Sequence, residues 1–464
     1  MTAAEDKNPW LRLARISRDH AENKRLWNGY QKYLLRPDID IDEYQRQMEN
    51  PKFADIEDLS DAEIHNIQTE IPDLPKELEK RGEIALTEGL TKIKTPLELD
   101  GFYFAFGVAI ENTTFQSVLT LNHAQFATSL YADDCIFKED LYAQGANFGP
   151  FTTFSMCRFI GTTRFSGAKF EDAYFDQSNF EDYCDFTNAD FDGETYFIDC
   201  IFTDSVTFSN AKFHGGSDFR LTAASSAAVP ISFYATKFCR HPPHFFGRKM
   251  HEDTDWTDVK LPNARSKTAQ CECLRENDKC ADDVDQMADK PMDPKVQATL
   301  LRQILVEDKR AYEQLRIKCG ALGKVEDEHL FFRKEMELTG RLSPWYTRAT
   351  YRLYHLVSDY GYSYWRPIAG MGWLWVLWSV FYALHFMARD QLHLCMDGVE
   401  LLLRTMGLSF ANIFAVFGFY RRFPSDLLAD PTFMTVLLTV SETLLGFVFL
   451  FFLGLGLRTR FRLR

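Results

Sequence analysis

The sequence lacks the short motifs that mark the common enzyme classes. It contains no phosphate-binding loop, no GxSxG nucleophile motif and no HExxH metal-binding motif. Its ten cysteines do not show the paired spacing of a disulfide framework, which favours a reducing compartment. The first twenty residues are charged and have no apolar core, so no secretory signal is expected there. We therefore predict that the protein is not an enzyme and has no cofactor and no metal site.

The chain also has fewer basic residues than acidic ones. The chain carries 52 Lys and Arg against 66 Asp and Glu, a formal net charge of −14. This balance argues against a generally basic nucleic-acid binder, so no nucleic-acid partner is expected. Most of the excess falls in residues 101–220, which hold 17 acids against 6 bases. A solvated acidic surface, which needs no partner, is one explanation of this excess.

Phenylalanine, in contrast, is abundant, with 41 residues in the chain. Two interleaved series, one starting at Phe104 and one at Phe154, recur together at alternating steps of five and six residues. Neither an α-helix nor a β-strand has this period, whereas a solenoid with one short step per face does. The core positions predicted from the first series include Phe126, Phe137, Phe148, Phe159, Phe170, Phe180, Phe191, Phe202 and Phe213.

A small residue stands two positions before most of these phenylalanines. One large and one small inward side chain per face would fill a narrow tube at the packing density of a protein interior. Four of the small positions are cysteines, which we interpret as small core residues rather than redox or metal-binding groups. These cysteines are Cys135, Cys157, Cys184 and Cys200.

This pattern, seen in TRFSGAKFEDAYFDQSNFEDYCDFTNADF, resembles the pentapeptide-repeat family over residues 102–238. The resemblance implies a right-handed, four-sided β-helix in which the Phe and the small residue both point inward. The extra residue in alternate units departs from the strict five-residue repeat and predicts larger corners. Some members of this family mimic DNA with an acidic rod and protect topoisomerase, which gives a further hypothesis for the acidic surface. The acids expected on the outside include Asp133, Asp134, Asp172, Asp182 and Asp190.

The segments on either side of the repeats differ from them in composition. A charged, mostly helical arm precedes the repeats, and a polar, aperiodic stretch follows them. Helical periodicity then returns, with a turn at Gly320 and Gly323 that predicts a helical hairpin. The predicted domains are an N-terminal arm over 1–95, a solenoid over 100–245, a flexible acidic loop over 246–294, a helical linker over 295–360 and a transmembrane domain over 361–464.

The predicted acidic loop contains three closely spaced cysteines, Cys271, Cys273 and Cys280. Zinc sites usually combine two CxxC-type knuckles, or cysteine with histidine. The CxC spacing followed by one distant cysteine does not match this arrangement. Exposed thiols in a loop are the favoured interpretation.

Two C-terminal stretches are long and apolar enough to cross a membrane. Residues 368–387 carry no formal charge, and residues 432–457 contain a single acid, Glu442. Each meets the length required for a hydrocarbon core of about 30 Å. Basic residues flank both stretches on the sides away from the intervening loop, which predicts an inner-membrane protein with both termini in the cytoplasm. The flanking residues include Arg366, Arg458, Arg460 and Arg462.

The segment between the two spans, 398–423, is too interrupted for a third crossing and too apolar for an ordinary loop. A helix followed by an irregular turn that dips into the membrane is the sharper prediction. The order of helix, pore-like loop and helix is similar to the two-span ion-channel module of some pentapeptide-repeat proteins. No TVGYG-like filter is present, so potassium selectivity is not supported. An interfacial or dimer-packing helix is the alternative.

Four polar residues are candidates for a role inside the membrane. A charged Glu442 is costly to bury in lipid, so one interpretation is that it lines a channel or takes part in proton-linked sensing. The alternative is a structural hydrogen bond to His385, Ser441 or a neighbouring subunit. Ser409 and Asn412 are residues that a pore loop would present, and they could equally satisfy the backbone of a turn.

The combined prediction is an oligomeric ion channel in contact with membrane lipid. Its cytoplasmic solenoid would sense or dock a protein partner. The competing class is a non-conducting scaffold, in which a membrane anchor displays a protein-binding rod. A homo-oligomer is expected for a channel because one hairpin cannot enclose a pore.

Overall fold

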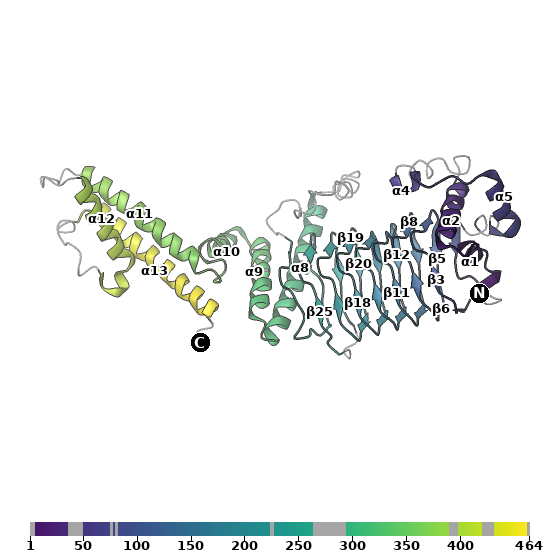
Figure 1. The fold of residues 1–464 in the computed structure, drawn as a ribbon. Coiled ribbons are helices and arrows are strands. Elements are labelled where there is room, and N and C mark those ends of the chain that lie inside the picture. Colours follow the sequence, from purple (N-terminus) through teal and green to yellow (C-terminus); the bar gives the residue numbers. More distant parts are fainter. Residues whose placement is uncertain are drawn as a thin grey trace. The chain divides into compact units, whose positions relative to one another are not determined.

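A computed structural model describes residues 5–35, 50–74, 78, 82–222, 227–262, 294–388, 398–419 and 431–461. The chain forms two compact units, Met1–Phe331 and Phe332–Arg464, and each is described by itself below. The first unit contains a β-solenoid between helical segments, and the second is helical (Figure 1).

Short parallel strands build the solenoid, and each strand pairs with the equivalent strand one coil away. The first face contains β1 (Glu83–Ala85), β5 (Gly107–Ala109), β9 (Leu130–Tyr131), β12 (Phe151–Thr153), β16 (Asp172–Tyr174), β20 (Thr195–Tyr196) and β24 (Ser217–Asp218). The second contains β2 (Lys92–Ile93), β6 (Thr114–Phe115), β10 (Ile136–Phe137), β13 (Arg158–Phe159), β17 (Asn179–Phe180) and β21 (Ile201–Phe202).

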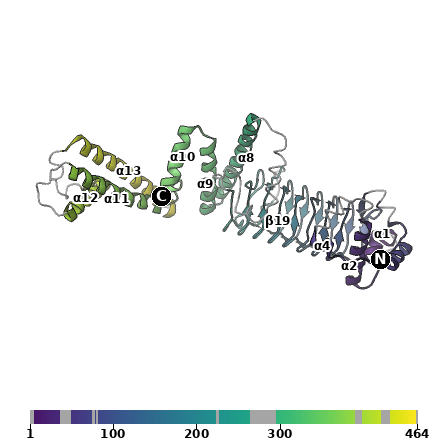
Figure 2. The same cartoon turned by 90° about the horizontal axis from the view of Figure 1, so that it is seen from above.

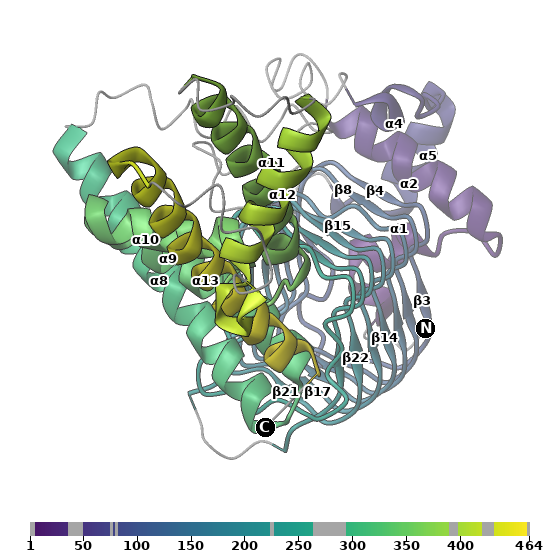
Figure 3. The ribbon, with the colours of Figure 1, turned by 90° about the vertical axis from the view of Figure 1, so that its left-hand side faces the viewer.

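The other two faces complete a four-sided coil, seen from one end in Figure 3. The third face contains β3 (Leu97–Glu98), β7 (Leu119–Thr120), β11 (Leu141–Tyr142), β14 (Thr163–Arg164), β18 (Cys184–Asp185), β22 (Val206–Thr207) and β25 (Ile231–Ser232). The fourth contains β4 (Tyr103–Phe104), β8 (Gln125–Phe126), β15 (Lys169–Phe170), β19 (Asp190–Phe191), β23 (Lys212–Phe213) and β26 (Lys237–Phe238). Single bridges through Asn147 join β8 to β15. The predicted four-sided β-solenoid is therefore confirmed.

Stacked phenylalanines fill the tube. On the fourth face, the ring centroids of Phe148 and Phe170 are 4.6 Å apart, and those of Phe170 and Phe191 are 5.1 Å apart. These spacings are close to the distance between neighbouring strands, so each coil adds one ring to the stack. Rings of adjacent faces meet edge to face, as Phe165 and Phe170 do. All nine phenylalanines predicted from the first series are buried.

A corner with left-handed backbone lies inside each five-residue step that follows a longer one, as Met156 does between Phe154 and Phe159. Such positions recur every eleven residues from 112 to 167 and, after one ten-residue step, again from 177 to 210. Asn and Asp tolerate this conformation better than most residues, and Gly is free to adopt it. The residues with positive φ in this series are Asn112, His123, Asp134, Gly145, Met156, Gly167, Gln177, Asn188, Asp199 and Asn210. One left-handed corner therefore recurs every two faces, inside the shorter of the two alternating steps.

The solenoid is longer at both ends than the predicted range of 100–245. Its first strand begins at Glu83, because the first coil uses Ile and Leu as core residues in place of Phe. At the other end, Trp256 stacks on Phe233 at 4.5 Å, and Lys260 pairs with Lys237. A boundary based on Phe alone misses the first and the last coil, because the core residues of these coils are large and apolar but are not Phe. The rest of the predicted acidic loop, 263–293, and its three cysteines lie outside the described residues.

Helices cover the first coil of the solenoid (Figures 1 and 2). Trp27 donates from Nε1 to the carbonyl oxygen of Tyr103 at 2.9 Å and packs against Phe102 and Phe104. The buried Glu5 carboxylate accepts from the backbone N of Lys94 at 2.7 Å. The helices are η1 (Glu5–Lys7), α1 (Pro9–Ala14), α2 (His20–Leu34), α4 (Pro51–Ala54) and α5 (Asp61–Glu70).

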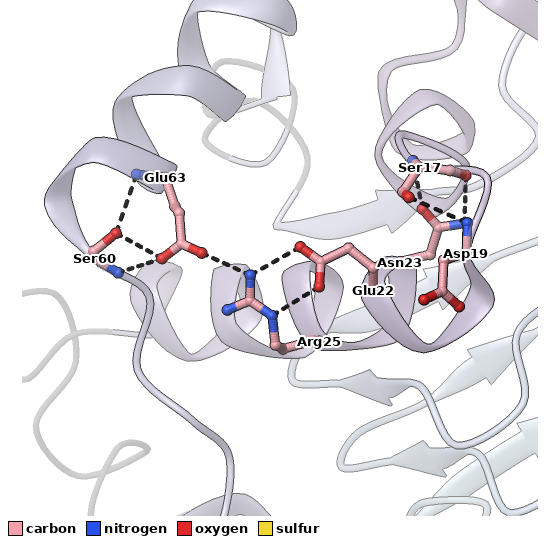
Figure 4. Close-up of polar contacts among 7 residues, drawn as sticks. All are labelled: Ser17, Asp19, Glu22, Asn23, Arg25, Ser60 and Glu63. Atoms are coloured by element: carbon pink, nitrogen blue, oxygen red, sulfur yellow. Dashed lines mark hydrogen bonds and ion pairs between the residues drawn. The ribbon is translucent and has the colours of Figure 1, made fainter.

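Arg25 joins two of these helices (Figure 4). It donates from Nε and Nη2 to the Glu22 carboxylate on its own helix α2, and from Nη2 to Glu63 Oε1 on α5 at 2.6 Å. Glu63 is also the third residue of α5 in a capping box with Ser60. Hydrogen bonds from Ser60 and Arg25 lower the pKa of Glu63 to about 2.

The last coil is covered by a buried arginine and by α8 (Pro294–Ala321). Arg248 donates from Nε to the carbonyl oxygen of Phe219 at 2.7 Å and from Nη2 to that of Cys200 at 2.8 Å. Lys318 of α8 donates to the carbonyl oxygen of Arg248 at 2.8 Å. A tight turn with a positive φ at Gly323 separates α8 from α9 (Val325–Leu342), as the sequence predicts.

The second unit contains the C-terminal part of α9 and the remaining helices. Two of them, α11 and α13, are long and apolar enough to cross a membrane by length and composition. Many of their apolar side chains are exposed, including Trp373 at 76% and Leu444 at 63%. The helices are α10 (Trp345–Ser358), α11 (Trp365–Ala388), α12 (Gly398–Ile413), η4 (Ala415–Phe417) and α13 (Phe433–Phe461).

Candidate functional site in the helical unit

The candidate site lies where α11, α12 and α13 pack against one another (Figure 2). Near the C-terminal end of α11, Tyr382 and Phe386 form an apolar cluster with Leu401 of α12. Nearer the N-terminal end of α11, Met371 packs with Ile413 at the end of α12. The helix α12 therefore runs antiparallel to α11 and ends part of the way along it.

The end of α11, the start of α12 and the start of α13 lie close together. His385, in the last turn of α11, contacts Thr432 Oγ1 at 3.2 Å and Thr435 Oγ1 at 3.1 Å, at the start of α13. The start of α12 lies at this end too, since Leu401 packs against Phe386. At 16 residues, α12 is about 24 Å long, shorter than a full crossing. It is followed by η4 and by Gly418, whose φ is 76°. This matches the helix-then-turn geometry expected for 398–423 over its described part, residues 398–419.

A hydrogen-bonded polar cluster lies at the centre of the three helices. Glu442 of α13 is fully buried, and both of its carboxylate oxygens have partners. Tyr382 Oη donates to Glu442 Oε2 at 2.9 Å, and Asn412 Nδ2 donates to the same oxygen at 3.1 Å. Ser409 Oγ lies within hydrogen-bond distance of Glu442 Oε1 and of the carbonyl oxygen of Trp375. A carboxylate with three donors is satisfied in apolar surroundings where a bare one would be costly.

Two indole groups of α11 attach α12 and α13 to it near this cluster. Trp375 Nε1 donates to the carbonyl oxygen of Met406 at 2.9 Å, and Trp378 Nε1 donates to that of Leu438 at 3.1 Å. Buried indole N–H groups usually find such partners. The short helix α12 is thus attached to α11 and α13 through polar as well as apolar contacts.

The structure brings together three of the four polar residues selected from the sequence. Ser409, Asn412 and Glu442 converge, while His385 lies apart from them with Thr432 and Thr435. The structural hydrogen bond considered for Glu442 is therefore made within the same chain, and to other residues than His385 or Ser441. Ser441 instead donates to the carbonyl oxygen of Leu438 at 3.0 Å.

Tyr382 is the member of the cluster that sequence reasoning missed. A Tyr inside an apolar span is commonly interpreted as an interfacial residue, so it gave no separate signal. Its position sixteen residues after Arg366 places it well inside the predicted span, and that depth is the signal which could have identified it.

The predicted flanking arginines lie at the opposite ends of the helices from His385. Arg366, at the start of α11, donates to the carbonyl oxygen of His355 at 2.7 Å and lies 3.6 Å from Asp359 Oδ1. Arg458 is exposed near the end of α13. The side chain of Arg460, and Arg462 as a whole, lie outside the described part of the chain.

The acids of the solenoid have a structural role of their own. Several accept a hydrogen bond from a backbone N–H 22 residues further on, one coil away. Asp140 Oδ1, for example, accepts from Thr162 N at 3.0 Å, and Asp172 Oδ1 accepts from Glu194 N at 2.8 Å. Asp133 bonds to Ser155 in the same way. These contacts explain part of the acidic composition without a binding partner.

The solenoid cysteines are buried, as their place in the repeat predicts. Burial raises the pKa of the Cys200 thiol to about 12, and that of Cys184 well above its usual value. Neither thiol is a reactive nucleophile in such surroundings. Elsewhere in the solenoid, Asp190, Asp192 and the buried His214 place ligand atoms within 4.8 Å of one another, but Lys212 Nζ lies 3.9 Å from Asp190. A neighbouring ammonium group disfavours a cation at this position.

Comparison with known proteins identifies the repeats. A family model described as pentapeptide repeats (9 copies) matches residues 150–189 and 175–222. These residues lie in the central and C-terminal coils of the solenoid. No curated protein and no solved structure matches the chain.

Proposed function

We propose that this pentapeptide-repeat solenoid is held at a membrane by α11 and α13, which span the bilayer. The proposal is supported by the exposed apolar side chains along both helices, which need an apolar environment. It is also supported by the basic residues at the N-terminal end of α11 and the C-terminal end of α13. By the positive-inside rule, these ends and the solenoid would face the cytoplasm of a cell with an inner membrane.

The second part of the proposal is that the three helices form an ion-conducting module in a homo-oligomer. The observation that carries it is the geometry of α12 and its turn, which enter the helical unit beside the end of α11 and stop part of the way along it. Irregular backbone at membrane depth is tolerated only inside protein or beside a water-filled path. Val416 and Phe417 are each 65% exposed in one chain, so other copies would have to surround this turn.

The Glu442 cluster has a supporting role in this proposal. Glu442, Ser409 and Asn412 bond to one another within one chain, so they would fix α12 rather than line the pore. The backbone carbonyl groups of the turn that ends at Gly418 are then the groups available to an ion. No catalytic residue is proposed, and the solenoid would dock a cytoplasmic protein.

Conduction is tested by ion flux into liposomes that contain the purified full-length protein. We expect flux from the wild type and at least about a ten-fold loss from Gly418→Val, because a β-branched residue is strained at positive φ. Gly372→Val is the matched control, since Gly372 lies in α11 and a Cβ there meets no atom within 4 Å. Oligomer size is measured on the same samples. A correctly inserted oligomer that passes no ion under any ionic condition would exclude the channel.

The second candidate is a non-conducting scaffold that displays the solenoid. It is favoured by the apolar side chains at the turn and by the complete internal pairing of Glu442. Under this alternative, Gly418→Val changes no ion flux, and capture of a cytoplasmic protein requires only the solenoid. The topoisomerase hypothesis is tested separately, by whether the full-length protein inhibits DNA supercoiling by gyrase.

A further inference from the structure

One face of α10 is strongly apolar and has no partner among the described residues. Trp345, Ala349, Leu353 and Leu356 follow one another at steps of four, four and three residues, so they share one side of the helix. Trp345 is 80% exposed and Leu356 is 71% exposed. These values exceed those expected for a helix that belongs only to the core of a soluble unit.

Arginines flank this apolar face. Arg348 and Arg352 are one helical turn apart, and both are exposed. Helix α10 contains no Asp or Glu. Within the described part of the chain, Arg352 has no hydrogen-bond or ion-pair partner, and Arg348 contacts only the carbonyl oxygens of Arg341 and Ser343. Two cations beside an apolar stripe are thus left without counter-charges.

The opposite side of α10 packs against the ends of the proposed spans. The rings of Tyr354 and Phe452 of α13 are 5.6 Å apart, and Val357 and Ser358 are buried. Phe452 lies six residues before the exposed Arg458, and Arg366 at the start of α11 reaches the carbonyl oxygen of His355. Helix α10 therefore lies at the level where both long helices change from apolar to basic composition.

From this arrangement we propose that α10 is an interfacial helix that binds anionic phospholipid in the cytoplasmic leaflet. Trp345, Leu353 and Leu356 enter the boundary between headgroups and acyl chains, while Arg348 and Arg352 contact headgroup phosphates. Amphipathic helices with aromatic and aliphatic residues on one face and arginine at its edge bind membranes in this way. Tryptophan is also enriched at this depth. The proposal rests on the membrane position of α11 and α13 proposed above, and it adds the lipid class and the residues that select it.

The test uses the full-length protein in detergent, titrated with phosphatidylglycerol and measured by native mass spectrometry. We expect the double variant Arg348→Gln/Arg352→Gln to need about 25-fold more lipid for the same occupancy, because each of the two basic residues near an anionic surface contributes on the order of a factor of five. The matched control is Arg302→Gln/Arg310→Gln, which removes the same charge from exposed positions on α8 and should bind as the wild type does. Equal binding by both double variants would overturn the proposal.

A second measurement reports on the apolar face. Quenching by brominated phosphatidylglycerol, taken as the difference between the wild type and Trp345→Phe, should show Trp345 in contact with acyl chains. A Trp345 that is not quenched, because a second copy or another part of the chain covers it, would contradict the proposal. Resistance of the wild type to alkaline extraction from membranes tests the spanning helices independently. A wild type that resists extraction but shows no preference for phosphatidylglycerol would exclude the α10 surface and leave the spanning helices unaffected.

Discussion

At the residue scale, the left-handed corners of the solenoid show how a local conformational preference recurs once in every two faces. Asn, Asp and Gly occupy most of these corners, and each adopts positive φ at low cost. Met156 is an exception, with a φ of 55° and a side chain that is 50% exposed. Its side chain therefore makes few packing contacts that could offset the strain of this backbone conformation.

Replacement of Met156 by Asn should therefore stabilise the solenoid, by about 1 kcal/mol, because Asn tolerates the left-handed conformation better. Gly167→Ala is the matched opposite change at an equivalent corner with φ of 67°, and it should destabilise the solenoid by about 1 kcal/mol. Thermal unfolding of the two variants measures both effects. A Met156→Asn protein less stable than the wild type would contradict this account of the corners.

At the element scale, the helices of the N-terminal arm are joined by specific polar contacts. Arg25 holds α2 to α5 through Glu63, and Ser60 caps α5 through the same carboxylate. The pKa of Glu63 is lowered in the folded state, so the ionised carboxylate is the form that stabilises the contact. Figure 4 shows how the two helices converge on this one side chain.

The stability that Glu63 contributes should depend on pH in a defined window. It is fully present above the ordinary pKa of 4.5 and is lost as the pH falls through the folded value of about 2. We expect the difference in melting temperature between the wild type and Glu63→Gln to disappear over this interval. Glu57→Gln, an exposed acid before the same helix, serves as the control. A difference that does not change with pH would show that Glu63 acts by shape rather than by charge.

At the scale of the whole molecule, the chain has two compact units with different cores. Phenylalanine ladders fill the first, and the polar cluster around Glu442 lies at the centre of the second. Because the two cores share no residue, a change in one should leave the stability of the other unaltered.

Glu442→Ala tests this separation. The substitution leaves the donors of Tyr382, Ser409 and Asn412 without their acceptor in an apolar environment, which should cost about 1–3 kcal/mol. Calorimetry in detergent should show a lower transition temperature for the helical unit and an unchanged solenoid transition. Glu442→Gln, which retains one acceptor and the side-chain volume, should have a smaller effect. A shift of the solenoid transition by either variant would argue against separate cores.

The sequence by itself determined the solenoid and the two apolar helices. Core periodicity reflects which side chains point inward, and a repeat of five and six residues is incompatible with a lone helix or strand. The corner at Met156 and the stack through Phe170 are local consequences of that repeat. Apolar length is likewise visible in one dimension, so α11 and α13 could be placed to within a few residues.

Only the tertiary structure decided which residues complete each core and which meet in the site. Trp256 extends the stack because a ring of similar size fits above Phe233, which periodicity in Phe does not reveal. Tyr382, Asn412 and Glu442 are separated by 30 residues or more, and their contact depends on the packing of α12 against the two longer helices. Hydrogen-bond partners so far apart in the chain are selected by the packing of the helices, and no local pattern in the sequence encodes that choice.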